Sequence, residues 1–297
     1  MVYSNIFSIF NANKHQRSKC MKNKSHFWTW GYVLDQVPGE AFFIPGVTSC
    51  SLETGAEYLN CENVFWLNPL HTQDAICDWQ MERLQNCKRV IAGLTHIETN
   101  GPGKGGWKIE YYESAMKLAR LSLKYKNLQG VIIDDFRSPV GPSRDMTDDE
   151  LKAIYTDMKA INPELKLFLV YYHTTQRPDS LLSCRDYFDG LTVWCWHSTD
   201  YFWNALYEEE IRMLRENYSD KELIQGQFLH AYGDGSKPQP MDQLTNQCSK
   251  ISSMLERKKI DGWCALQTGW FSFQSHREQV EYVKNYWNWY RDTHTVL

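Results

Sequence analysis

Eight short apolar runs recur along the chain, and segments with helical spacing of their apolar residues separate most of them. The runs are rich in β-branched and aromatic residues and are bounded by glycine or polar residues, which is typical of buried parallel strands. They cover residues 26–34, 63–68, 89–96, 130–136, 166–173, 191–197, 223–230 and 261–267. Helices are predicted at residues 72–85, 111–125, 147–161, 201–216, 240–255 and 276–290.

The helix that begins after Thr147 is the best marked of these. Thr147 is placed to cap it, and Glu150 follows three residues later, which together form the sequence pattern of a capping box. Leu151, Ile154 and Met158 then repeat at helical spacing and form an apolar stripe. This pattern predicts a helix that packs one face against the strands.

Eight strands alternating with helices are the number that a (β/α)₈ TIM barrel requires. The predicted fold is therefore a single α/β barrel over residues 26–297, preceded by a flexible tail over residues 1–25. An open doubly wound sheet is the alternative, but its nucleotide-binding forms carry a glycine fingerprint after the first strand, and none follows Leu34. The connection from residue 34 to 63 has no convincing helical pattern and is expected to be a long loop over the barrel mouth.

Composition excludes several classes of partner. The 297 residues include 32 basic and 36 acidic side chains, and this balance argues against nucleic acid or an anionic membrane as the main partner. The nine cysteines contain no CxxC pair, so neither a disulfide framework nor a zinc site is expected. No run approaches the roughly 18 apolar residues of a membrane span, and the apolar patch 6–10 precedes its basic residues, unlike a secretory signal. We expect a cytoplasmic protein that needs no metal or cofactor.

The fourth strand ends in two adjacent carboxylates, Asp134 and Asp135. Charge at the rim of an apolar interior is desolvated, and a like-charged neighbour adds to this, so the carboxyl pKa rises toward the range of an acid catalyst. The alternative is that one aspartate caps the following turn and the other is solvated. Because strand side chains alternate, Asp134 should face inward with Ile132, and Asp135 should reach the mouth only if the strand bends or ends there.

The other strand ends are polar and aromatic, and in such barrels the groups that act on substrate project from the carboxyl ends of the strands. Gln225 and Gln227 alternate with apolar residues, so they share one face, which we expect to be the barrel interior. Trp194 and Trp196 also share a face, and tryptophan at a mouth is suited to stacking on sugar rings. The predicted substrate-binding residues are Trp30, Asn68, His96, Tyr172, His173, Trp196, Gln227, His230, Gln267 and Trp270.

The stretch Gly130–Phe136, with the sequence GVIIDDF, resembles the fourth-strand motif of (β/α)₈ glycoside hydrolases related to chitinases, hexosaminidases and O-GlcNAc hydrolases. The resemblance implies that Asp134 orients the 2-acetamido group of the substrate and that Asp135 is the general acid and base. The chitinase pattern continues with a glutamate that has no counterpart at Phe136. A second carboxylate across the barrel, as conventional glycosidases have, could be Asp234 or Glu98.

The function predicted from the sequence is therefore hydrolysis of a glycosidic bond. Two alternatives stay open: a carbohydrate-binding barrel without catalysis, and a metal-dependent hydrolase in which His173, His197 and His230 join Asp134. The glycine-rich segment 100–106 lacks the spacing of a phosphate-binding loop and is interpreted as a lid or surface loop.

Overall fold

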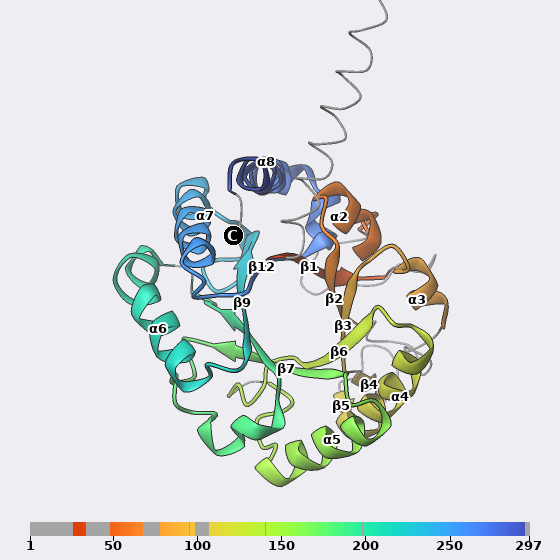
Figure 1. The fold of residues 1–297 in the computed structure, drawn as a ribbon. Helices are drawn as coiled ribbons and strands as arrows, with labels where there is room; N and C mark the ends of the chain where they lie inside the picture. The colour runs from red at the N-terminus through yellow and green to blue at the C-terminus, as the bar shows by residue number, and fades with distance from the viewer. Residues whose placement is uncertain are drawn as a thin grey trace, which may run out of the picture.

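Eight parallel strands close into a barrel, and helices surround it on the outside (Figure 1), which confirms the predicted (β/α)₈ fold. The computed structural model describes residues 26–33, 48–67, 78–94, 96–98, 107–139, 141–197 and 199–294, so the predicted tail lies outside the described residues. The barrel strands in chain order are β1 (Phe27–Tyr32), β2 (Asn63–Leu67), β3 (Arg89–Gly93), β6 (Leu128–Ile133), β7 (Lys166–Tyr172), β8 (Gly190–Trp194), β9 (Glu222–Phe228) and β12 (Gly262–Leu266). Strand β12 pairs with β1 and closes the ring.

The outer layer consists of helices in the βα connections (Figure 1). They are α2 (Leu52–Tyr58), α3 (Asp78–Arg83), α4 (Tyr111–Lys124), α5 (Asp148–Ile161), α6 (Tyr207–Asn217), α7 (Met241–Glu256) and α8 (Arg277–Thr293). Shorter helical turns are η2 (Leu182–Tyr187), η3 (Phe202–Leu206), η4 (Thr268–Ser272) and η5 (Gln274–His276). No helix among the described residues is long and apolar enough to cross a membrane.

Two parts of the architecture differ from the sequence prediction. The first connection, predicted as a loop, contains the seven-residue helix α2, which buries Leu52, Gly55 and Ala56 and is too short for a clear helical period. Strand β3 ends at Gly93 rather than at residue 96, and a small antiparallel hairpin follows it, formed by β4 (His96–Glu98) and β5 (Trp107–Ile109). A second hairpin, β10 (His230–Ala231) with β11 (Lys237–Pro238), follows β9.

Aromatic side chains fill the inside of the barrel. Trp30 stacks on Phe65 with ring centroids 4.9 Å apart, and Trp28 packs on the same ring at 4.8 Å. Trp194 crosses Trp30 edge to face at 5.5 Å. The inward-facing cluster consists of Trp28, Trp30, Phe65, Ile91, Ile132, Phe168, Val170, Trp194, Ile224, Phe228 and Cys264. Because these side chains pack against one another, the barrel has a solid apolar centre, and the mouth has an apolar floor.

Charged residues close the opposite end of the barrel, where β3, β7 and β9 begin. Arg89 donates two hydrogen bonds to Glu222, at 2.7 and 2.9 Å, and Lys166 donates a third at 2.9 Å. Burial raises the pKa of Glu222, but the hydrogen bonds and positive charges of Arg89 and Lys166 outweigh it, and the pKa lies below the ordinary value. Three strands are thus joined by one ionised carboxylate.

The start of α5 has the predicted capping box. The Glu150 N–H donates to Thr147 Oγ1 at 3.2 Å, and the Thr147 N–H donates to Glu150 Oε2 at 2.7 Å. Leu151, Ile154 and Met158 are buried, as the apolar stripe predicts. The cap fixes where the β6–α5 connection ends, and this connection carries the two aspartates.

Candidate active site

The adjacent aspartates lie in a tight turn at the carboxyl end of β6. The strand ends at Ile133, and residues 134–137 turn away from it. Ile132, two residues before Asp134, belongs to the inward-facing cluster of the barrel. Asp135 has φ of +48° and Arg137 has φ of +52°, which are left-handed conformations that side chains other than glycine rarely adopt. The sequence predicted that Asp135 would reach the mouth only if the strand bent or ended there. The strand does end there, directly before the pair.

Polar contacts from the following loop hold this turn. Ser143 Oγ donates to the Asp135 carbonyl oxygen at 2.9 Å and accepts the Arg137 N–H at 3.1 Å. The Arg137 side chain donates to the Met146 carbonyl oxygen at 2.8 Å and to Asp148 Oδ1 at 2.6 Å. Left-handed residues cost free energy and persist where surrounding contacts fix them, and such sites are often functional. Ser143 and Arg137 supply those contacts here.

The two carboxyl groups perturb each other. Burial, together with the negative charge of Asp135, raises the pKa of Asp134 from 3.8 to about 8, although the Asp135 N–H donates to Asp134 Oδ1 at 2.9 Å. Burial also raises the pKa of Asp135, while a hydrogen bond from Tyr172 acts in the opposite direction. The pKa of Tyr172 is raised by burial and by the charges of both aspartates. The pair therefore holds a proton near neutral pH, and Asp134 is the more strongly shifted member.

An aromatic cluster lies beside the pair at the mouth. Tyr172, at the end of β7, contacts Trp196 edge to face with ring centroids 6.3 Å apart. Trp196 stacks on Tyr232 at 5.6 Å with an angle of 19° between the rings, and Phe228 lies beneath both. Tyr172, Trp196 and Tyr232 are all partly exposed, so part of each ring reaches the surface. Tyr172 and Trp196, both predicted from the sequence as substrate-binding residues, therefore contact each other at the carboxyl ends of β7 and β8.

Four other predicted substrate-binding residues lie beneath the surface. Trp30 has an exposed fraction of 1% and belongs to the filling of the barrel, and Trp194, which shares the inward face with Trp196, is equally covered. His230 and Trp270 are each 3% exposed and stack on each other at 4.2 Å, and Gln267 is 1% exposed. The prediction that these four residues contact sugar at the surface is wrong. The end of a strand can be read from the sequence, but the side chains that cover a residue at that end cannot.

The predicted inward direction of the two glutamines of β9 is also wrong. Gln227 points outward, where it donates to Gln247 of α7 at 3.4 Å and accepts the Trp263 indole N–H at 3.0 Å. Gln225 donates to the Val193 carbonyl oxygen at 2.9 Å on the same outer side. The inward positions of β9 are Ile224 and Phe228. Gln227 therefore supports the packing of α7 on the barrel and does not face the mouth.

Of the remaining predicted residues, the structure describes the side chain of His173. His173 packs on Phe202 with ring centroids 3.9 Å apart and lies 3.8 Å from Glu210, so it faces the outer helices. His96 begins β4 in the hairpin beyond β3, and Asn68 lies outside the described residues. Of the second carboxylates considered, Asp234 contacts His197 at 3.3 Å. The histidines of the metal hypothesis thus have different partners, and the described residues contain no group of three or more metal-ligating side chains.

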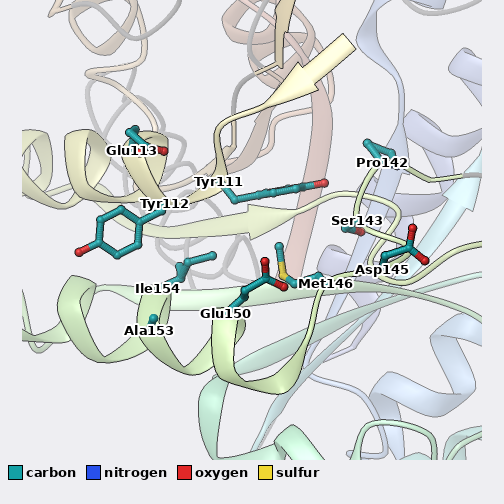
Figure 2. Close-up of a pocket in the computed structure, with 10 residues that line it drawn as sticks. All are labelled: Tyr111, Tyr112, Glu113, Pro142, Ser143, Asp145, Met146, Glu150, Ala153 and Ile154. Atoms are coloured by element: carbon teal, nitrogen blue, oxygen red, sulfur yellow. The ribbon is translucent and has the colours of Figure 1, made fainter. Parts of the chain in front are cut away.

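A pocket of about 430 Å³ lies between the first turns of α4 and α5 and is also lined by residues of the connection that leads to α5 (Figure 2). Figure 2 shows the Tyr111 ring extending from α4 toward Ser143, with Met146 and Ile154 on the facing side. Burial raises the pKa of Tyr111, and the negative charges of Asp134 and Asp135 raise it further. Sequence reasoning missed Tyr111 and Ser143, because neither stands at the end of a barrel strand.

The raised pKa of Asp134 predicts a pH-dependent cost in stability. The folded-state pKa of about 8 exceeds the ordinary value of 3.8, so this group favours folding below pH 4, and its contribution is lost as the pH rises through 8. Asp134→Asn removes this loss. We expect the variant to be more stable than the wild type at pH 8, by up to about 5 kcal/mol, and to lose the difference toward pH 4.

Urea unfolding at pH 4.5 and 8 measures this effect. Asp145→Asn is the matched control, because Asp145 lies in the same connection but its exposed side chain pairs with Arg144. An equal pH dependence in wild type and Asp134→Asn would contradict the assignment of a buried, protonated Asp134.

No family model and no curated protein matches this chain. Solved structures do match its barrel. A protein described as an alpha-L-fucosidase from Bacteroides thetaiotaomicron is 12% identical, with a TM-score of 0.59 over 92% of this chain and 98% of that one. The active domain 2 of a chitinase from Pyrococcus furiosus is 12% identical, with a TM-score of 0.53 over 91% and 97%.

Structural neighbours of this chain are TIM-barrel glycoside hydrolases. The tryptophan synthase alpha-subunit from Pyrococcus furiosus is also similar, at 11% identity and a TM-score of 0.51 over 89% of this chain and 96% of that one. Because that protein is not a glycoside hydrolase, the likeness establishes the barrel alone, and the chemistry has to be argued from the site.

Proposed function

We propose that this protein is a glycoside hydrolase whose acid catalyst is the pair Asp134 and Asp135. The observation that carries the proposal is the position of two mutually perturbed carboxyl groups at the carboxyl end of β6, next to an aromatic mouth. Glycosidases need one carboxyl group that keeps its proton near neutral pH and one carboxylate that stabilises positive charge on the sugar. The pKa values of this pair are pushed upward by burial, which supports the first requirement.

The surroundings of the pair divide the two roles. Asp134 has the higher pKa, about 8, and lies over the apolar floor, so we assign it the proton that passes to the departing oxygen. Asp135 receives the Tyr172 hydrogen bond, which favours its ionised form, so we assign it the stabilising carboxylate. This order is the reverse of the one that the resemblance to chitinases and O-GlcNAc hydrolases implies.

The aromatic cluster provides the sugar contact in this proposal. Trp196 is backed by Tyr232 and therefore presents a rigid ring face, which stacks on the C–H face of a sugar. Its neighbour Tyr172 joins this surface to the acidic pair. A sugar on Trp196 would thus lie beside the carboxyl groups.

Turnover of an aryl glycoside panel tests the function. The panel comprises 4-nitrophenyl fucosides, mannosides, glucosides and N-acetylglucosaminides in both anomeric forms, with release of nitrophenol as the readout. We expect hydrolysis of at least one member by the wild type and by Asp145→Asn, and loss of that hydrolysis in the double variant Asp134→Asn/Asp135→Asn.

The same panel separates the carbohydrate-binding alternative. Calorimetric binding of a sugar without turnover of any glycoside would favour a binding barrel. Equal turnover by the wild type and the double variant would remove the pair from the mechanism.

A further inference from the structure

A second cluster of reactive groups lies where the β10–β11 hairpin meets η5. Its members are two serines and two histidines joined in a continuous chain of hydrogen bonds. Ser236 Oγ lies 3.0 Å from His230 Nε2, and His230 Nδ1 lies 2.9 Å from His276 Nε2. His276 Nδ1 in turn lies 2.9 Å from Ser275 Oγ. The histidines are buried, whereas Ser236 is exposed.

We infer that Ser236 is a nucleophile with His230 as its general base and His276 as the group that positions that base. The order serine, histidine, positioning group is the arrangement by which a serine hydroxyl is activated for acyl transfer. The substrate class is a carboxylic ester with a short acyl group. This inference goes beyond the proposed glycosidase activity and does not depend on it.

The protonation states allow the required direction of proton transfer. Burial lowers the pKa of both His230 and His276 to about 4, so both rings are neutral at pH 7. In one of the two possible arrangements, the Ser236 hydroxyl donates to His230 Nε2, and His230 Nδ1–H donates to His276 Nε2. His276 Nδ1–H then donates to Ser275 Oγ, which completes the chain.

The rings of the chain are held rigidly. Trp270 stacks on His230 at 4.2 Å with 5° between the rings, and on His276 at 4.1 Å with 23° between them. The Trp270 indole N–H donates to the Tyr232 hydroxyl at 2.8 Å, so this clamp is tied to the mouth. A base that is held in one orientation loses little entropy when its proton transfer begins.

The backbone around Ser236 has the geometry of a sharp turn that exposes a side chain. Ser236 has φ of +47°, and Gly235 before it has φ of +91°. A left-handed serine costs free energy, and such residues are often found at functional sites. A Cβ added at Gly235 would meet no atom within 4 Å, so the space above this turn is open to an incoming ester.

The reaction balances without any other co-reactant than water. Ser236 Oγ bonds to the carbonyl carbon while its proton passes to His230 Nε2; the ester C–O bond then breaks, and the departing alcohol takes that proton. In the second half, water attacks the acyl carbon and gives a proton to His230 Nε2; the bond from this carbon to Ser236 Oγ then breaks, and Oγ takes that proton. The products are the carboxylic acid, the alcohol and the free Ser236 hydroxyl.

Labelling with a fluorophosphonate probe, read by mass spectrometry of the full-length protein, tests the inference, together with hydrolysis of 4-nitrophenyl acetate. We expect the wild type to gain one adduct on the peptide that contains Ser236. Ser236→Ala should lose both the adduct and ester hydrolysis. Ser219→Ala is the matched control, because it changes another exposed serine outside this cluster and should leave both unchanged.

Two further variants serve as comparisons. The first tests whether His230 activates the serine or whether an exposed hydroxyl reacts by itself. The second tests whether this reaction is independent of the proposed glycosidase activity. His230→Gln retains a polar side chain of similar length but cannot accept the proton of the Ser236 hydroxyl. This variant should react less with the fluorophosphonate probe, and its circular dichroism should match that of the wild type. Asp134→Asn should label like the wild type, so loss of glycosidase activity leaves this test intact. An unlabelled wild type, or equal labelling of Ser236→Ala, would show that the chain is only structural and would overturn the inference.

Discussion

Asp134→Asn is expected to lower kcat on an unactivated glycoside by about 10²- to 10⁴-fold, the range of a lost general acid. The physical reason is that asparagine keeps the shape and the hydrogen bond from the Asp135 N–H but has no proton to give. The loss should shrink on a 2,4-dinitrophenyl glycoside of the same sugar, because that leaving group departs without protonation. Steady-state kinetics on the two substrates measure the difference.

Asp135→Asn distinguishes the two roles. A stabilising carboxylate is needed whatever the leaving group, so this variant should be slow on both substrates. Asp145→Asn should match the wild type on both, because its exposed carboxylate pairs with Arg144 outside the pair. If the leaving-group dependence belongs to Asp135→Asn instead, the roles follow the order implied by the resemblance, and our assignment is wrong.

Gly141→Ala is expected to lower kcat by about 10²-fold, the scale of an ångström displacement of a reacting group. A Cβ at this position would lie 2.6 Å from the Asp135 carbonyl oxygen and 2.7 Å from its Cβ, which is closer than such atoms approach. The acidic turn must therefore shift. Gly141 contacts the backbone of the pair and not a substrate, so the effect on kcat should exceed that on KM.

Arg144→Ala is the control for this variant, because it changes an exposed residue three positions later in the same connection. We expect it to keep wild-type kinetics. Combining Gly141→Ala with Asp134→Asn provides a second check: if both act on the same proton transfer, the double variant should be little worse than Asp134→Asn. Additive losses would show that Gly141 acts elsewhere.

Much of the fold could be predicted from the sequence, because each barrel strand is a compact apolar run. All eight runs contain a strand in the structure, and the capping box of Thr147 and Glu150 marked the start of α5. The parts that were missed are short. Helix α2 and the hairpin β4–β5 have too few residues for a period to be visible, and α2 packs against η4, which is distant in the sequence.

The candidate site was predictable only in part. Asp134, Asp135, Tyr172 and Trp196 were found because they stand at strand ends, where the topology brings them together. Gln227 was misplaced because alternation shows which residues share a face and does not show which face is the interior. Trp30 and Trp270 were misplaced for a different reason: burial depends on side chains from several strands.

Gly141, Ser143 and Tyr111 could not have been found in this way. They come from the connection after β6 and from the start of α4, and their relation to Asp135 exists only in three dimensions. Their sequence neighbourhoods resemble ordinary turns and helix starts.

The ion pairs of Glu222 with Arg89 and Lys166 lie at the end of the barrel opposite the acidic pair. Arg89, Lys166 and Glu222 close one end, and the aromatic filling blocks the axis, so the described part of the chain leaves no channel through the barrel. If the chain hydrolyses glycosides as we propose, substrate, water and both products would enter and leave at the carboxyl end of the strands. A product sugar that stays bound to Trp196 would block binding of the next substrate. The free sugar is therefore expected to be a competitive inhibitor, and its dissociation rate would set an upper limit on kcat.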